Sequence, residues 1–193
     1  KDIIQVFDKK TGLLINTVKF NENTCRMCYD KERNQIFISS YQKKKLYRVE
    51  IVGALVKDPE LLTFNSDYFG ASCKSGEHIY IVVNDAIKKF VSTTKPSESV
   101  EMAPIVSTNT LCGTNGMTIL RKHIIFTTKL NEIKCITLDG EDVYCFKDDA
   151  IKTPIALSAL QSGLILVVDR YDKGSLHILS EDGTKHKTLL DKF

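Results

Sequence analysis

Short apolar runs recur along the chain at nearly constant spacing. One pattern, an Ile or Leu followed three positions later by another apolar residue, occurs five times at intervals of 43, 41, 46 and 43 residues. Its copies are Ile3/Val6, Leu46/Val49, Ile87/Phe90, Ile133/Ile136 and Leu176/Leu179. A second apolar run precedes the last four copies, at 36–38, 79–82, 124–126 and 164–168. A period in the low forties built from short β-rich runs is typical of a β-propeller, in which each repeat forms one four-stranded blade.

The last repeat shows the expected blade most clearly. Its apolar and polar alternation predicts four strands, A to D from the centre outward, at 154–160, 164–169, 175–180 and 184–190. Gly163 and the Asp182-Gly183 pair lie between these strands, and such residues favour tight turns. Strand B is the most apolar strand of each repeat, which is expected where neighbouring blades cover both faces.

The same spacing predicts the layout of the whole chain. Four blades are expected, at 21–60, 61–103, 104–149 and 150–193, and residues 1–20 match only the outer strands C and D of a further blade. We therefore expect one all-β domain over residues 1–193, with about four and a half blades of a six-bladed ring. A longer protein would supply the missing strands; assembly with another chain, including a second copy, is the alternative.

Composition adds few constraints to this fold. Hydrophobic residues make up 42% of the chain, and a formal net charge of +3 does not by itself indicate nucleic-acid binding. No run of eighteen apolar residues predicts a membrane helix, and the first residues do not resemble a signal peptide. The six cysteines are scattered, which indicates reduced thiols that fill core positions. We expect a cytoplasmic protein without membrane contact.

The repeats resemble the NHL repeat of six-bladed propellers. The residues that carry the resemblance are Pro154-Ile155-Ala156, Val167-Val168-Asp169 and the Leu176-to-Gly183 segment in the last blade, together with 5–12 near the N-terminus. The other blades depart from the motif, as at 25–30, at Asn84 and at 126–128. Such propellers occur at the C-terminus of tripartite-motif ubiquitin ligases, so the resemblance implies a module that selects a protein substrate or binds RNA. RING and B-box segments are not found in this sequence, so ligase activity is not assigned to it.

Metal, cofactor and catalytic chemistry are not expected from the sequence. Cys25 and Cys28 have the spacing of a metal-binding pair, but no second pair follows, and residues three apart on a strand point to opposite faces. The four histidines, His78, His123, His177 and His186, fall in different blades and lack a neighbouring nucleophile, so we expect surface positions. No catalytic residue, metal site or cofactor is predicted.

A propeller enzyme of the gluconolactonase type is the second alternative function. Such enzymes hold a metal or substrate with acidic and amide side chains in the channel. The candidates for this role are Asp30, Asn84, Asn115 and Asp169, of which only Asn84 and Asp169 occupy the same position after strand B. We expect these residues instead to bond to neighbouring backbone and fix the loop between strands B and C. The chain is therefore predicted not to be an enzyme.

A basic loop face is the predicted binding surface. The B-to-C loops of three blades contribute Tyr41, Lys43, Lys44, Lys45, Lys129, Arg170, Tyr171 and Lys173. In a propeller these loops share one face with the connections between strand D and the next strand A. Cations and exposed aromatic rings can bind phosphate and stack on bases, so single-stranded RNA binding is the first alternative. Acidic neighbours such as Asp172 dilute the charge, and we therefore favour a protein partner.

Overall fold

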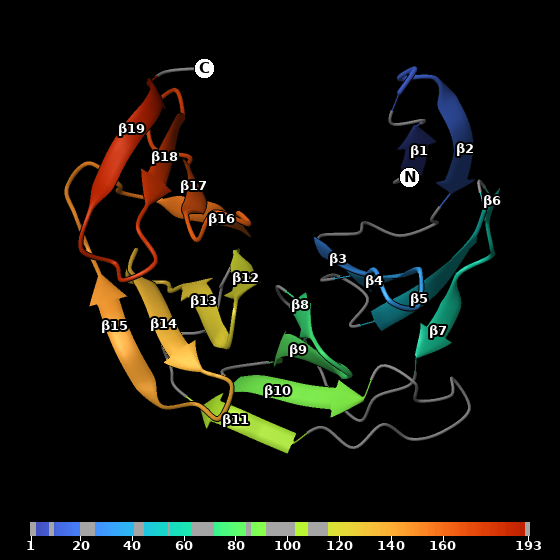
Figure 1. Cartoon of the computed structure of the whole chain (residues 1–193), viewed down its shortest axis with the longest axis horizontal. Coiled ribbons are helices and arrows are strands. Elements are labelled where there is room, and N and C mark those ends of the chain that lie inside the picture. The colour runs from blue at the N-terminus through green and yellow to red at the C-terminus, as the bar shows by residue number, and fades with distance from the viewer. Residues whose placement is uncertain are drawn as a thin grey trace. The chain divides into compact units, whose positions relative to one another are not determined.

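The fold is known from a computed structural model that describes residues 3–7, 10–19, 26–40, 45–53, 55–62, 72–83, 86–91, 103–107 and 116–191. All regular structure in these ranges is β-strand (Figure 1). Within them no helix has the length and apolar character needed to cross a membrane. The prediction of an all-β fold is confirmed.

The strands form antiparallel sheets in which consecutive strands pair, except that β6 and β7 both pair with β5. The first sheet pairs β1 (Ile3–Phe7) with β2 (Leu14–Lys19). The second contains β3 (Arg26–Asp30), β4 (Gln35–Ser40), β5 (Lys45–Val52) and β7 (Glu60–Leu62), with β6 (Leu55–Val56) paired to the far end of β5. The third contains β8 (Ser72–Ser75), β9 (His78–Val83), β10 (Ala86–Val91) and β11 (Ala103–Ser107). The fourth contains β12 (Met117–Leu120), β13 (His123–Thr127), β14 (Ile133–Thr137) and β15 (Asp142–Phe146). The fifth contains β16 (Pro154–Ala159), β17 (Ile165–Asp169), β18 (Ser175–Leu179) and β19 (His186–Asp191).

These sheets differ from the predicted blades at two boundaries. The predicted division at 60/61 lies inside β7, which pairs with β5 in the second sheet. The strands of the last sheet agree with the predicted strands to within two residues at each end. Residues 104–107, however, belong to β11, which pairs with β10 and completes the third sheet. The predicted division at 103/104 therefore lies inside a strand, and the following blade begins with β12.

The turn between the first and second strands repeats one backbone feature. Asn34, Gly76, Arg121 and Gly163 all have positive φ, with values of 53°, 55°, 54° and 88°. A reversal between two antiparallel strands often requires this conformation, which glycine and asparagine adopt at least cost. Arg121 adopts this positive-φ conformation although residues with a side chain disfavour it. The blade repeat is thus visible in backbone geometry as well as in the apolar pattern.

The chain divides into two compact units, each with its own core. Unit 1 contains residues 1–83 and 90–102, and unit 2 contains residues 84–89 and 103–193. In unit 1, Phe37, Leu46, Ile79 and Ile81 are fully buried in one cluster, together with Phe90, and a smaller cluster joins Val18 of β2 to β4 and β5. Unit 2 has a cluster between its last two sheets, made of Leu120, Ile125, Ile133, Cys135, Ile151, Ile165, Val167 and Leu179. The second strands β9 and β13 are buried on both faces beyond their first residue, as expected for strands B.

Candidate binding pocket in the last sheet

A pocket of about 140 Å³ lies at one end of the last sheet, in unit 2. It is formed where the loop between β17 and β18 meets the segment before β16 and the end of β19. Its lining residues are Ala150, Lys152, Asp169, Tyr171, Asp172, Lys173, Gly174, Ser175 and Asp191. Its volume is close to the roughly 150 Å³ that suffices for a benzene-sized ligand. The pocket thus admits one small side chain or a small molecule.

Asp169 holds the two walls of this pocket together. It ends β17 and is only 2% exposed. Its carboxylate accepts hydrogen bonds from the backbone N–H groups of Lys152 at 2.9 Å, Thr153 at 2.7 Å and Tyr171 at 3.1 Å. A buried carboxylate with three N–H donors is well satisfied and fixes the backbone around it. The expected loop-fixing role of Asp169 is confirmed.

Tyr171 and two lysines form the mouth of the pocket. The Tyr171 side chain is largely exposed, and Lys152 Nζ lies 4.3 Å from the centre of its ring, within the range of a cation–π interaction. Lys173 is exposed and, among the residues described, forms no ion pair. Asp172 and Asp191 line the same pocket, so its charge is mixed. The mouth offers an aromatic face, ammonium groups and carboxylates within one small surface.

Ser175 lines the pocket, and the buried His177 lies beside it on the same strand. Ser175 Oγ lies 2.7 Å from His177 Nε2, and Thr188 Oγ1 lies 3.1 Å from His177 Nδ1. Ser175 is 9% exposed and His177 is 2% exposed. Burial lowers the pKa of His177 below its ordinary value, against the opposing effect of the Asp169 carboxylate. His177 is therefore neutral at pH 7, and its ring accepts or donates hydrogen bonds as an uncharged group.

The structure corrects the expectation that the histidines are surface residues. His177 is buried because it alternates with Ser175 and Leu179 on the inward face of β18. His186 of β19 is partly buried, with its ring 5.5 Å from that of Phe146 and its Nε2 3.7 Å from Asp148 Oδ1. His78 and His123 begin the second strands β9 and β13 and are partly buried. The alternation of Ser175, His177 and Leu179 along one strand was the sequence signal that could have placed His177 on the buried face.

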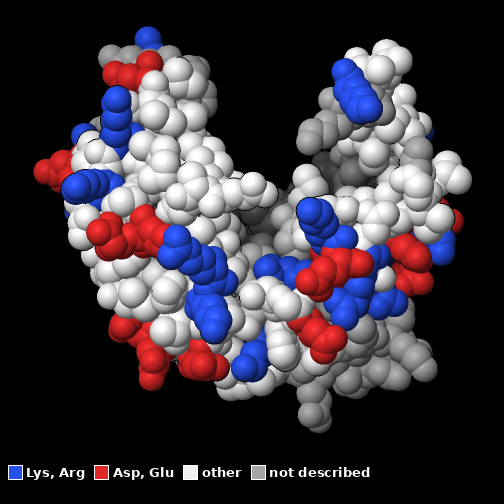
Figure 2. All heavy atoms as spheres, in the orientation of Figure 1, with Lys and Arg blue, Asp and Glu red and all other residues white. Residues whose placement is uncertain are grey.

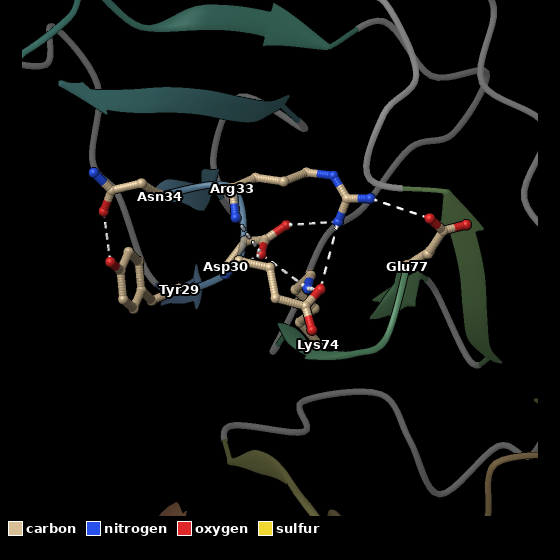
Figure 3. Close-up of polar contacts among 7 residues, drawn as sticks. Tyr29, Asp30, Arg33, Asn34, Lys74 and Glu77 are labelled. Carbon is tan, nitrogen blue, oxygen red and sulfur yellow. Dashed lines mark hydrogen bonds and ion pairs between the residues drawn. The ribbon is translucent and has the colours of Figure 1, made fainter.

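A second polar cluster lies in unit 1 and joins two sheets. Asp30, at the end of β3, is fully buried, and its carboxylate is 2.9 Å from Lys74 Nζ of β8 (Figure 3). Arg33 bridges Asp30 Oδ2 at 3.5 Å and Glu77 Oε1 at 3.2 Å. Desolvation raises the pKa of the Asp30 carboxyl, but the Lys74 and Arg33 bonds outweigh it and the net pKa is lowered. Every charge in this cluster has a partner, which indicates a structural role.

The predicted basic surface is only partly brought together. Tyr41, Lys43 and Lys44 lie outside the described residues. Lys45 is the first residue of β5 in unit 1, and Lys129 lies in the exposed turn after β13 in unit 2. Among the predicted residues, Tyr171 and Lys173 line the pocket, and Arg170 is exposed beside it.

Sequence reasoning missed Lys152, Ser175, His177 and Asp191. Lys152 could have been found, because the connection before strand A shares a face with the B-to-C loops.

The charge of the described surface is mixed, with acidic groups beside lysines and arginines on the face in Figure 2. Within the described ranges, no group of three or more His, Cys, Asp or Glu side chains is placed to hold a metal ion.

Comparison with solved structures identifies the fold as a β-propeller. A chain from a crystal structure of the nidogen/laminin complex aligns with a TM-score of 0.74 and 14% identity, over 95% of this chain and 70% of that one. A putative 6-phosphogluconolactonase from Bacteroides uniformis aligns with a TM-score of 0.68 and 14% identity, over 95% of this chain and 62% of that one. No protein family matches the sequence, and no curated protein is significantly similar to it. The predicted propeller fold is confirmed, while at such low identity the likeness extends to the fold alone.

Proposed function

We propose that this chain is an interaction module that binds a protein through the pocket of the last sheet. The observation that carries the proposal is the exposed Tyr171 beside a small pocket. Exposed aromatic side chains beside a small pocket are typical anchors of protein interfaces. The Asp169 hydrogen bonds keep the loop in place before a partner arrives, which reduces the ordering cost of binding.

The similar structures support this proposal at the level of the fold. One of them belongs to a nidogen/laminin complex, so a protein of this fold has been crystallised with a partner protein. Loops on a rigid β scaffold commonly carry such binding sites. We further propose that the chain is the substrate-selecting part of an NHL-type, tripartite-motif protein in the cytoplasm, following the resemblance of its last repeat. In this proposal the main role of the chain is to bind a protein, and the chain does not catalyse a reaction of the gluconolactonase type.

Site-specific crosslinking tests the binding proposal. A photoreactive phenylalanine analogue replaces Tyr171 in the whole chain, and the crosslinked protein is identified and then purified for affinity measurements. Tyr171→Ala combined with Lys173→Glu is expected to weaken that affinity at least tenfold, whereas Lys187→Glu on the same sheet leaves it unchanged. Both lysines are exposed, so the two variants are matched in charge change. Equal affinity of the pocket variant, the control and the unmodified chain would refute the proposal.

Single-stranded RNA is tested with the same variants. A protein held mainly by phosphate contacts loses affinity steeply between 50 and 200 mM salt. We expect no RNA binding with that salt dependence, because Asp172 and Asp191 lie beside the lysines of the pocket. Steeply salt-dependent binding that Lys173→Glu removes would establish the RNA alternative in place of a protein partner.

A further inference from the structure

Ser175 and His177 have the mutual geometry of a nucleophile and its base. The Ser175 hydroxyl oxygen is 2.7 Å from His177 Nε2, within the 2.6–3.2 Å range expected for such a pair. The second ring nitrogen lies 3.1 Å from the Thr188 hydroxyl, which fixes the orientation of the ring. A serine, a histidine base and a third group that orients the base constitute the arrangement that activates a hydroxyl nucleophile.

Ser175 of this pair lines the pocket, so a small molecule bound there would lie against this residue. Lys152 and Lys173 line the same pocket, and ammonium groups stabilise the negative charge that develops on a carbonyl oxygen under attack. Ser175 and the two lysines therefore line one volume of about 140 Å³, and His177 contacts it through Ser175.

The backbone deviates from regular pairing at this position. The register between β18 and β19 shifts between Leu176 and His177, so that His177 faces Thr188 while Leu176 faces Leu190. The same kind of shift follows Val6, Ile87 and Cys135 in three other sheets, so the bulge is a feature of the blade repeat. Bulges re-aim side chains. Here the bulge brings the Thr188 hydroxyl opposite the His177 ring.

Burial also suits the base to its role. Desolvation lowers the pKa of the His177 imidazole, and His186 acts in the same direction. Together they outweigh the carboxylates of Asp169, Asp191 and Asp148, which raise it. A neutral ring at pH 7 can accept a proton. In the tautomer that fits a base, His177 Nδ1–H donates to Thr188 Oγ1 and His177 Nε2 accepts from the Ser175 hydroxyl.

We propose that Ser175 is a reactive nucleophile that His177 activates, and that it cleaves small, uncharged carboxylic esters whose acyl group fits the pocket. Ser175 Oγ bonds to the ester carbonyl carbon as its proton passes to His177 Nε2. The ester C–O bond then breaks, and the leaving alcohol takes that proton. Water, deprotonated by the same nitrogen, hydrolyses the acyl-serine to a free acid and restores the hydroxyl. This activity goes beyond the proposed binding function and does not depend on it.

Covalent labelling tests the proposal directly. The whole chain is incubated at pH 7.5 with a small fluorophosphonate, and adducts are located by peptide mass spectrometry. We expect one adduct, at Ser175, that Ser175→Ala abolishes and that Ser158→Ala, at an exposed serine of β16, leaves unchanged. The same variants are compared in the hydrolysis of p-nitrophenyl acetate. An absence of adduct at Ser175, or equal labelling and hydrolysis in Ser175→Ala, would overturn the proposal.

The role of His177 has its own measurement. His177→Gln can retain a hydrogen bond to the serine but cannot act as a base, so labelling is expected to slow by about 100-fold. In the unmodified chain the labelling rate should fall with decreasing pH as His177 is protonated, and this dependence should disappear in His177→Gln. A thermal melt shows whether each variant is folded. A folded His177→Gln that labels at the original rate would contradict activation by this histidine.

Discussion

Both units join neighbouring sheets through buried apolar clusters, and unit 1 adds a buried ion pair. In unit 1 the strands β3 and β8 meet through the buried Asp30–Lys74 pair, which Arg33 extends to Glu77. In unit 2 the last two sheets meet through an apolar cluster, and Gly116 and Gly183 let neighbouring groups approach closely. The ion pair there, Arg121–Glu181, is largely exposed on the arginine side.

The difference shows that neighbouring blades can pack through either kind of contact, provided that their surfaces fit and each buried polar group has a partner. A buried ion pair stabilises only when each charge is paired, whereas an apolar interface depends on volume. Unit 1 should therefore respond to loss of a charge as well as to changes in core volume, whereas unit 2 should respond mainly to added volume. The following predictions separate these responses, from the largest effect to the smallest.

Gly140→Ala should cause the largest loss of stability. Gly140 has a φ of 95°, and an added Cβ would lie 2.5 Å from the backbone oxygen of Ile105 in β11. Strain and overpacking together predict a destabilisation of about 3 kcal/mol. Gly12→Ala is the control, because Gly12 also has positive φ but no atom lies within 4 Å of its added Cβ, which leaves about 1 kcal/mol of strain. Urea unfolding measures both, and equal losses would show that the close approach to Ile105 is unimportant.

Lys74→Met should have the next largest effect, confined to unit 1. It removes the closest cation from the buried Asp30, which keeps the longer Arg33 contact and the backbone N–H bonds of Glu32 and Arg33, and we expect a destabilisation of about 2 kcal/mol. Adding Asp30→Asn should recover part of this loss, since no buried charge then lacks its partner. A double-mutant cycle by urea unfolding measures the coupling, and additive losses would show that the two charges do not interact.

The pH dependence should differ between the units. Burial lowers the pKa of His177 in the folded chain, so the unfolded chain binds more protons and stability falls as the pH drops below about 6.5. The pKa of Asp30 is also lowered, so its contribution is present above about pH 4 and is lost only in stronger acid. Between pH 7.5 and 5.5 the unmodified chain should lose up to about 1.4 kcal/mol more than His177→Gln. The same loss in both would exclude His177 as the source.

Sequence patterns predicted the strands of unit 2 better than the boundary of the third sheet. Turn residues and alternation are local, so the strands of the last sheet were visible in the sequence. Pro104-Ile105 resembles the Pro154-Ile155 start of a first strand, but β11 is assigned by its pairing to β10, which local pattern does not reveal. The residues of the candidate pocket were only half predictable for the same reason. Tyr171 and Lys173 lie in a loop that the sequence identifies. The Ser175–His177–Thr188 contacts join two strands, and the sequence alone does not show which residues of those strands lie opposite each other.

Arg121→Ala should have the smallest effect, although it removes an ion pair between neighbouring sheets. Arg121 Nη2 lies 3.1 Å from Glu181 Oε2, but the arginine side chain is 69% exposed, so water competes for both charges. Exposed pairs contribute about 0.2–1 kcal/mol. The substitution also leaves a non-glycine residue at a φ of 54°, so the backbone strain is unchanged. Urea unfolding at low and high salt should show a loss below about 1 kcal/mol that shrinks with salt. A larger, salt-independent loss would mean that the blade interface of unit 2 depends on charge as strongly as that of unit 1.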